Sequence, residues 1–428
     1  MRKTVLILGL SICVPFIHAQ DTDKKFTLTE CIEWAMQNNV KLKNAQLNLK
    51  MANEEKSGAF SNYFPQVSAM GVGFAGKNDL VRGEMDIPMM GALPLSMVKE
   101  GIIGTLTAIQ PIYSGGQIIN GNKLAGIQQE IRQLELALAE KDVVQNVHTY
   151  YWKLVSLRGN IATLDAVERQ LKEVRRITEQ YVDAGVTTRN DLLRIELKQQ
   201  EVGSERLSLN NGIEVVRMVL AQLCGADLNT FDIEGQHILS PDAPETYYID
   251  TDLALSHREE TQLLEKGVKA QSLQVKMERG KNLPSVAIGA AALTYNVMDK
   301  GEGNIIGLAT VSIPISSWWE GSRHVRKAKM ALEQSRNTQQ DMRERLQIDI
   351  LSAWNALKEA YQQIGIAQQS VAQAEENLRL SRNRYEAGTT DMTELLDALT
   401  LYTQSHQRLI TACTDYQCRI AEYRQKTE

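Results

Sequence analysis

The chain has 428 residues, of which 43% are hydrophobic and 23% charged, and its formal net charge is −5. A mildly acidic chain offers no basic surface for phosphate groups, so we exclude nucleic acid as a partner. Aromatic residues are scarce at 6%, and this composition favours long helices over a compact aromatic core.

The N-terminus has the pattern of a secretory signal peptide, which we place at residues 1–20. A basic Arg-Lys pair precedes an apolar run over residues 5–17, and a polar segment follows. Cleavage of the signal peptide would remove Arg2 and Lys3 and change the formal charge from −5 to −7. Lipid attachment at Cys13 is an open alternative, which the bulky Ile12 before it disfavours.

The mature part of the chain has no run of 18 apolar residues, so the sequence predicts no transmembrane helix. An exported chain of this kind is soluble, anchored, or inserted in a membrane as strands. Four further cysteines show neither a disulfide framework nor a Cys-x-x-Cys metal motif, namely Cys31, Cys224, Cys413 and Cys418. We expect them to be small apolar side chains packed on helices.

The sequence contains an internal duplication. Three segments of the first half recur in the second, namely residues 64–69 as 283–288, 111–114 as 314–317 and 184–188 as 387–390. Between the first two segments the first copy is longer by 16 residues, which we place in one loop. We therefore divide the mature chain into a first repeat at 21–226, an equatorial linker at 227–253 and a second repeat at 254–428.

Each repeat begins with a helix and continues with two strands. The first helix starts at a capping box formed by Thr27 and Glu30. Alternating side chains predict the strands, which we place at Val67–Ala75, Ile103–Ile112, Val286–Tyr295 and Ile305–Ile315. In the first strand one face is mostly apolar and consists of Ser68, Met70, Val72 and Phe74.

Strands of about 9–11 residues can cross a bilayer when they are tilted. Four such strands cannot close a barrel, and lipid does not tolerate the two unpaired edges that they leave. If the strands span a membrane, the chain must therefore form an oligomer.

A very long helix follows the second strand of each repeat. Residues 116–185 contain no proline, and in the second repeat apolar residues alternate at spacings of four and three, as in a coiled coil. This stripe consists of Ile350, Trp354, Leu357, Tyr361, Ile364, Ala367, Val371, Ala374, Leu378 and Tyr385. Each long helix ends at a glycine turn, Gly185 or Gly388, and a second helix returns from it. The sequence thus predicts two long helical hairpins.

The sequence offers no catalytic or metal-binding constellation, so we expect neither an enzyme nor a cofactor. The six histidines stand alone, which leaves hydrolase triads and zinc sites without support. Residues 71–76 match Gly-x-Gly-x-x-Gly, but no helix follows to receive a pyrophosphate. Four methionines in one loop, Met85, Met89, Met90 and Met97, could bind a soft metal, although we favour an adaptable apolar surface.

Glu394 and Asp397 lie three residues apart at the start of the last helix, so both point to one side of it. In a monomer such a pair is a solvated helix face. In a symmetric ring it becomes a collar of like charges, which selects ions.

In its motifs the chain resembles the outer membrane efflux proteins, the TolC-type channels, over essentially its whole mature length. The resemblance rests on the order and duplication of four segments, namely residues 28–39, the strand starts at 64–65 and 283–284, Gln110–Gly116, and residues 385–398. It implies a trimer whose protomers contribute four strands each to a shared 12-strand β-barrel. Long helical hairpins then form a periplasmic α-barrel, with a mixed equatorial domain around it.

The resemblance also implies a function, an outer-membrane exit duct for a tripartite efflux or type I secretion system. A periplasmic adaptor, also called a membrane fusion protein, and an inner-membrane transporter are the implied partners. The adaptor meets the hairpin tips, which here are Gly185, Val186, Thr187, Gly388, Thr389 and Thr390.

The resemblance places the channel constriction at Glu394 and Asp397 and a gate link at Tyr385 and Asp191. A basic residue of the family's gate corresponds to Thr390 here, so we expect this latch to be weaker or differently made.

The alternative function is a soluble periplasmic coiled-coil scaffold or adaptor. The sequence leaves the exported substrate open: a drug, a metal ion or a polypeptide.

Overall fold

The computed structural model describes residues 25–77, 81–87, 91–97, 100–235, 241–297, 300–315 and 317–428. The predicted signal peptide and Cys13 lie outside these ranges, as do Met89 and Met90. By its internal contacts the chain divides into two compact units. Unit 1 comprises Met1–Asn39, Asn146–Ser240 and Ile364–Asp415, and unit 2 comprises Val40–Gln145, Pro241–Gln363 and Tyr416–Glu428. Both units draw on both sequence repeats.

The first helix begins where the sequence predicts it. Helix α1 spans Leu28–Asn38, and Thr27 caps it through a hydrogen bond from the backbone N–H of Glu30 to the Thr27 Oγ1 at 3.3 Å. The backbone N–H of Thr27 donates in return to Glu30 Oε2 at 2.9 Å, which completes the capping box. Helix α2, Val40–Ser61, follows.

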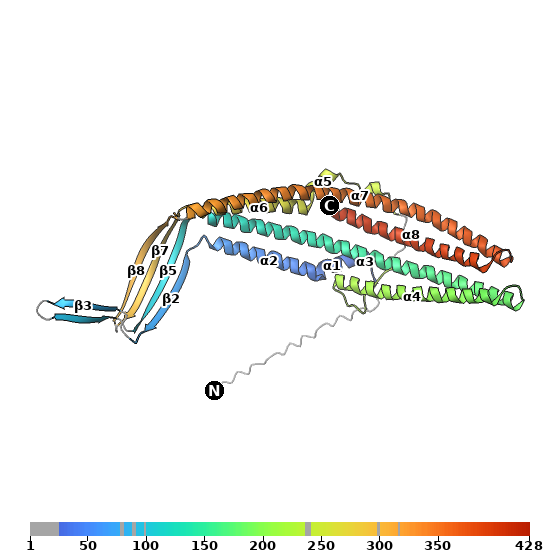
Figure 1. Cartoon of the computed structure of the whole chain (residues 1–428), viewed down its shortest axis with the longest axis horizontal. Helices are drawn as coiled ribbons and strands as arrows, with labels where there is room; N and C mark the ends of the chain where they lie inside the picture. The colour runs from blue at the N-terminus through green and yellow to red at the C-terminus, as the bar shows by residue number, and fades with distance from the viewer. Residues whose placement is uncertain are drawn as a thin grey trace, which may run out of the picture. The chain divides into compact units, whose positions relative to one another are not determined.

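Four long helices form two hairpins (Figure 1). The first consists of α3, Gln117–Asp183, and α4, Arg189–Cys224. The second consists of α7, Ser317–Glu386, and α8, Met392–Thr427. At about 1.5 Å per residue, a helix as long as α3 extends about 100 Å. Two shorter helices, α5 at Thr251–His257 and α6 at Glu259–Gly280, precede the second repeat's strands.

The coiled-coil stripe of α7 faces inward, as the sequence predicts. Eight of its ten residues are buried, while Trp354 is half-buried and Tyr361 is exposed. In unit 2, Leu357 is fully buried at 0% exposure, and Tyr361 stacks at a tilt against Tyr416 of α8. The hydroxyl of Tyr416 donates to the backbone oxygen of Asp242 at 2.7 Å, which ties the linker to the helical core.

The strands form one four-stranded antiparallel sheet in the order β2-β5-β7-β8. These strands span Gln66–Ala75, Glu100–Ser114, Ser285–Val297 and Lys300–Ser312. The two strand pairs thus come from the two repeats, and β5 joins β7 at the centre. The last strand ends three residues before the predicted Ile315, because Pro314 has no N–H for a ladder.

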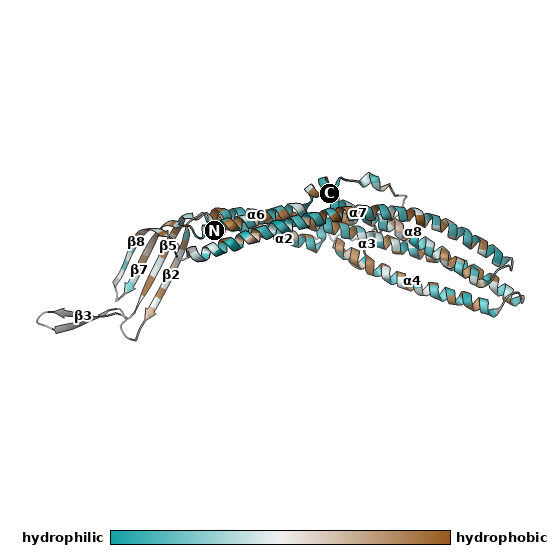
Figure 2. Ribbon diagram, turned by 45° about the horizontal axis from the view of Figure 1, so that its top comes forward, coloured by the Kyte–Doolittle hydropathy of each residue, from teal (hydrophilic) through white to brown (hydrophobic). Residues whose placement is uncertain are grey.

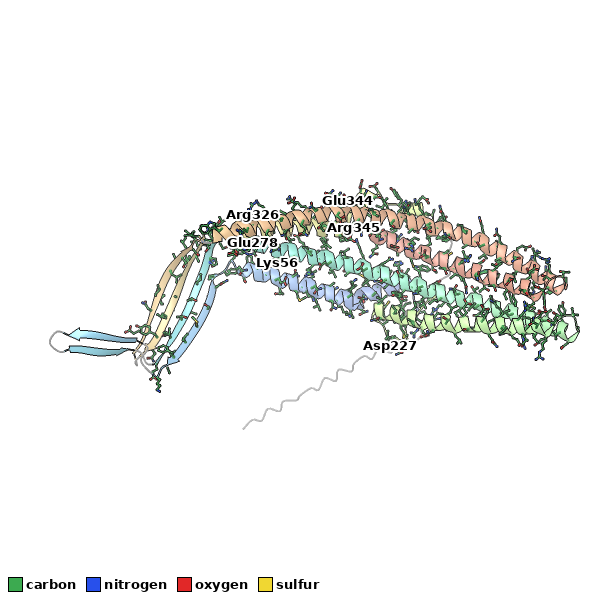
Figure 3. The ribbon with its side chains drawn as sticks, in the orientation of Figure 1. Lys56, Asp227, Glu278, Arg326, Glu344 and Arg345 are labelled. Atoms are coloured by element: carbon green, nitrogen blue, oxygen red, sulfur yellow. The ribbon has the colours of Figure 1, made fainter. Side chains whose placement is uncertain are left out.

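The sheet has one mainly apolar face. Cross-strand register aligns Ala69, Leu106, Ala292 and Ile305 in one row of this face, and Figure 2 shows apolar residues recurring along β2, β5 and β7. In the single chain Ile305 is 78% exposed. An exposed apolar surface of this kind marks a site of contact with protein or membrane.

The opposite face of the sheet is mixed. Ser68 Oγ and Thr107 Oγ1 share a hydrogen bond of 2.7 Å there, and Tyr295 donates to Glu302 at 2.8 Å. The β2 residues that the sequence singled out as mostly apolar, from Ser68 to Phe74, belong to this face. The more apolar side of the complete sheet is therefore the other one, which single-strand alternation could not reveal.

The extra residues of the first repeat lie in a segment that contains two paired strands. Strands β3, Val81–Ile87, and β4, Gly91–Met97, pair antiparallel within the predicted loop. The described residues of the proposed equatorial linker contain two short elements and the start of α5. Strand β6, Asp232–Ile233, pairs in parallel with β1, Lys25–Phe26, and a 3-10 turn, η1, spans Pro244–Tyr247.

Among the described residues, no helix is both long and apolar enough to cross a membrane.

The buried stripe of α7 yields a stability prediction. Leu357→Ala should lower the free energy of unfolding by about 2–5 kcal/mol, because it leaves a cavity in a packed core. Leu380→Ala on the same helix is the control, since Leu380 is 46% exposed. Chemical denaturation followed by circular dichroism measures both. Equal losses in the two variants would contradict the assignment of the stripe to the core.

Candidate gate at the hairpin tips

Both hairpins turn through a glycine with left-handed backbone geometry. Gly185 has φ +73° and Gly388 has φ +69°, a region that L residues other than glycine avoid. After each glycine a backbone N–H closes the helix end: Val186 donates to the oxygen of Tyr181 at 2.8 Å, and Thr389 donates to that of Arg384 at 2.9 Å. This bond pattern is the Schellman motif. The remaining predicted tip residues, Thr187 and Thr390, follow within two positions, and both are half-buried.

The returning helices repeat one side-chain arrangement. In α4, the hydroxyl of Thr187 donates to the Asp191 carboxylate four residues later. In α8, Thr390 donates to the Glu394 carboxylate in the same way. Because a constant offset of 203 residues relates these pairs, Asp191 and Glu394 occupy equivalent positions in the two repeats.

Glu394 has a basic partner that sequence analysis missed. Arg384 Nη1 lies 2.9 Å from Glu394 Oε1, and their side chains are 58% and 44% exposed. The backbone N–H of Glu394 also donates to Asp391 Oδ1 at 3.0 Å, which caps the first turn of α8. The hairpin geometry could have indicated the ion pair, since Arg384 and Glu394 lie near the tip on opposite arms.

Asp397 has a different environment from Glu394. It lies one turn further along α8 and is exposed. In the described part of the chain its carboxylate forms neither a hydrogen bond nor an ion pair. The predicted acidic pair therefore consists of one carboxylate that Arg384 partly neutralises and one that is exposed, with no polar partner among the described residues.

Tyr385 is buried at 5% exposure and links the two hairpins. Its hydroxyl lies 3.0 Å from Thr178 Oγ1 in α3, and Thr178 donates to the oxygen of Val174 at 2.9 Å. Because a threonine hydroxyl has one proton, Tyr385 is the donor in the shared bond. Burial raises the pKa of Tyr385, and the Asp191 charge adds to this effect.

The predicted partners Tyr385 and Asp191 do not bond directly within the described chain, since Asp191 is held by Thr187. Tyr181 provides a second link between the hairpins, because its hydroxyl donates to the oxygen of Glu386 at 2.9 Å. No sequence signal pointed to Thr178, which belongs to the uninterrupted helix α3. Its role depends on which turns of α3 and α7 face each other.

An apolar core holds the two hairpins together within unit 1. It includes Leu164, Leu171, Ile195, Met392 and Leu395. At its rim Arg194 donates to Thr393, and Gln407 donates to Glu205 at 2.7 Å. Within the described ranges, no cluster of three or more His, Cys, Asp or Glu side chains is placed to hold a metal ion. The arrangement is the packed end of four helices, with charged side chains on its surface.

Comparison with known proteins gives the fold a context. Residues 31–211 and 251–423 match the profile of the outer membrane efflux proteins, whereas no curated protein matches the sequence. The Campylobacter jejuni CmeC outer membrane channel superposes with a TM-score of 0.79 at 17% identity, over 100% of this chain and 94% of that one.

Two further outer membrane proteins have similar structures. VceC of Vibrio cholerae gives a TM-score of 0.78 at 16% identity, over 94% of this chain and 96% of its own. The open state of the Neisseria gonorrhoeae MtrE channel gives 0.76 at 16% identity, over 94% and 88%. These likenesses confirm the predicted fold class, a mainly helical chain with long hairpins and two strand pairs of the TolC type.

The Tyr385 link can be tested by removing one oxygen atom. Tyr385→Phe should lower the free energy of unfolding by about 0.5–1.5 kcal/mol, because a buried hydrogen bond is lost. Tyr402→Phe is the matched control, since within the described chain the Tyr402 hydroxyl makes no hydrogen bond. Denaturation of the purified protein measures both variants. A larger loss in the control would show that the hydroxyl of Tyr385 does not hold the hairpins.

Proposed function

Because the chain belongs to the outer membrane efflux protein family, we propose that it is the outer-membrane exit duct of a tripartite efflux or type I secretion system. The observation that carries this proposal is the four-stranded sheet, whose outer strands β2 and β8 each have one edge without a partner strand among the described residues. A duct needs such strands to continue into neighbouring copies. The proposed location is the outer membrane, with a large periplasmic part.

We propose a homotrimer in which three copies of the sheet close a 12-strand β-barrel. The register supports an orientation for each protomer. Its apolar face, with Val67 and Ile305, would meet lipid, and the mixed face, with Ser68 and Thr107, would line the lumen. The number three comes from the family resemblance, and the need for more than one copy comes from the open edges.

The gate of this duct would lie at the hairpin tips. In a trimer, Glu394 and Asp397 would each form a ring of three carboxylates around the axis. The tip residues at Gly185–Thr187 and Gly388–Thr390 would meet a periplasmic adaptor, which in turn engages an inner-membrane transporter. We keep Tyr385 and Asp191 as the proposed gate links. Opening would separate the hairpins and therefore strain the contact of Tyr385 with Thr178, which joins them.

The competing function is a soluble periplasmic scaffold or adaptor. It conflicts with the exposure of the sheet's apolar face, since Val67, Ile102 and Ile305 are 66%, 65% and 78% exposed in the single chain. Fractionation of the cell envelope separates the two functions. We expect the protein in the outer membrane, with slower gel migration when it is left unheated. Recovery as a soluble periplasmic monomer would contradict the duct.

The acidic rings give a prediction for single-channel recordings in planar bilayers. Glu394→Ala combined with Asp397→Ala should raise conductance or weaken block by divalent cations, because both rings lose their charge. Asp397→Asn alone should change conductance and block more than Glu394→Ala alone, because Arg384 already offsets the charge of Glu394.

Arg384→Ala is the control for this comparison, because it should increase the contribution of Glu394 to cation binding. Unchanged cation selectivity and block in the double variant would show that the pair is only a solvated helix face. It would leave the duct itself in place, since pore formation in the same recordings is a separate observation.

A further inference from the structure

Two cysteines that are far apart in the sequence meet in unit 1. Cys31 lies in the second turn of α1, and Cys224 is the last residue of α4. The Sγ of Cys224 lies 3.5 Å from the backbone oxygen of Cys31, although 193 residues separate them. The neighbouring Cys224 thiol, together with burial, raises the pKa of Cys31. Both side chains have 0% exposure.

The surrounding contacts hold the two helix ends in this position. Asn39, just after α1, donates through Nδ2 to the backbone oxygen of Leu223 at 2.8 Å. Gly225 ends α4 with φ +66°, and a Cβ there would lie 2.6 Å from the Cβ of Asn38. The residues on both sides of Cys224 thus contact the end of α1 closely. This packing of the two backbones brings the thiols near each other.

We propose that Cys31 and Cys224 form a disulfide that fastens the N-terminal helix α1 to the end of α4. The inference rests on the proposed location outside the cytoplasm, where oxidising conditions allow disulfides to form and persist. The sequence predicted the four cysteines to be apolar fillers, and the burial of Cys31, Cys224 and Cys413 agrees with that. For Cys31 and Cys224, however, the packing also places each cysteine beside another cysteine.

The chemistry requires an oxidant, which we assign to the class of disulfide-bearing thiol oxidoreductases of the cell envelope. One cysteine thiolate attacks the oxidant's disulfide, and a mixed disulfide forms as one oxidant thiolate leaves. The second cysteine thiolate then attacks this mixed disulfide and releases the other oxidant thiolate. The chain loses two electrons and two protons, and the oxidant gains them as two thiols.

The order of events follows from burial. Because both side chains are inaccessible in the folded chain, the exchange must precede the packing of α1 on α4 or accompany its opening. The product closes a loop of nearly 200 residues, which spans the first strand pair and the first hairpin. Cross-links that close long loops restrict the unfolded chain most strongly.

The remaining cysteines provide internal controls. Cys413 and Cys418 lie five residues apart on α8, which places them about 140° apart around the helix. They cannot bond to each other in that geometry. A tryptic digest separates the two sets, because Cys31 falls in residues 26–41, Cys224 in 218–258, and both control cysteines in 409–419.

Mass spectrometry of protein isolated from the outer membrane fraction tests the proposal. Free thiols are alkylated under denaturing conditions without reductant, and reduction followed by a second, heavier alkylating agent marks the former disulfides. Before reduction we expect a linked pair of peptides 26–41 and 218–258. After reduction we expect the heavy label on Cys31 and Cys224 only. Cys413 and Cys418 should carry the first label.

Non-reducing gels provide a second readout. The denatured wild-type chain and Cys413→Ser should migrate faster than Cys31→Ser or Cys224→Ser, and reductant should abolish the difference. First-label alkylation of Cys31 and Cys224 in membrane-inserted protein would overturn the disulfide and leave the duct standing. Absence of the protein from the outer membrane would instead contradict the proposed location.

Discussion

The unpaired edges of the four-stranded sheet are the constraint on which the rest of the proposed architecture depends. Each backbone N–H and C=O of an edge strand needs a hydrogen-bond partner, and hydrocarbon provides none. Within the described chain β2 and β8 lack a partner on one side, while one face of the sheet is apolar. A sheet of this kind is stable in a membrane only when further copies continue it. In the proposed duct the protomer is thus a segment of a larger closed structure.

The internal duplication fits this constraint, because each repeat supplies one strand pair and one hairpin. The two hairpins share their glycine turns and their threonine–acid contacts, but they differ in charge. Glu394 has Arg384 opposite it, whereas the Asp191 carboxylate accepts a hydrogen bond from Thr187 and forms no ion pair within the described ranges. Close to the glycine turn, the described ion pair between the two arms of a hairpin is therefore that of the second hairpin.

Features that depend on neighbours along one helix could be predicted from the sequence. The glycine turns, the capping box at Thr27 and the buried stripe of α7 all follow from spacings of a few residues. Strand positions also followed from alternation, to within a few residues at each end. Each of these features is decided by local backbone preference together with one buried face.

Features that depend on register or on long-range packing could not be predicted. The apolar face of the sheet became evident only when β5 and β8 were aligned with β2. The Thr178 contact of Tyr385 and the meeting of Cys31 with Cys224 depend on how helices from distant parts of the chain are placed. Strand pair β3–β4 was missed because Gly and Pro interrupt its alternation.

Native mass spectrometry of the protein extracted from the outer membrane in mild detergent tests the central claim most directly. Closure of the open sheet edges predicts an oligomer, and the family resemblance predicts a single species with the mass of three mature chains. A species with the mass of one chain, obtained under conditions that preserve known oligomers, would contradict the claim that neighbouring copies complete the sheet.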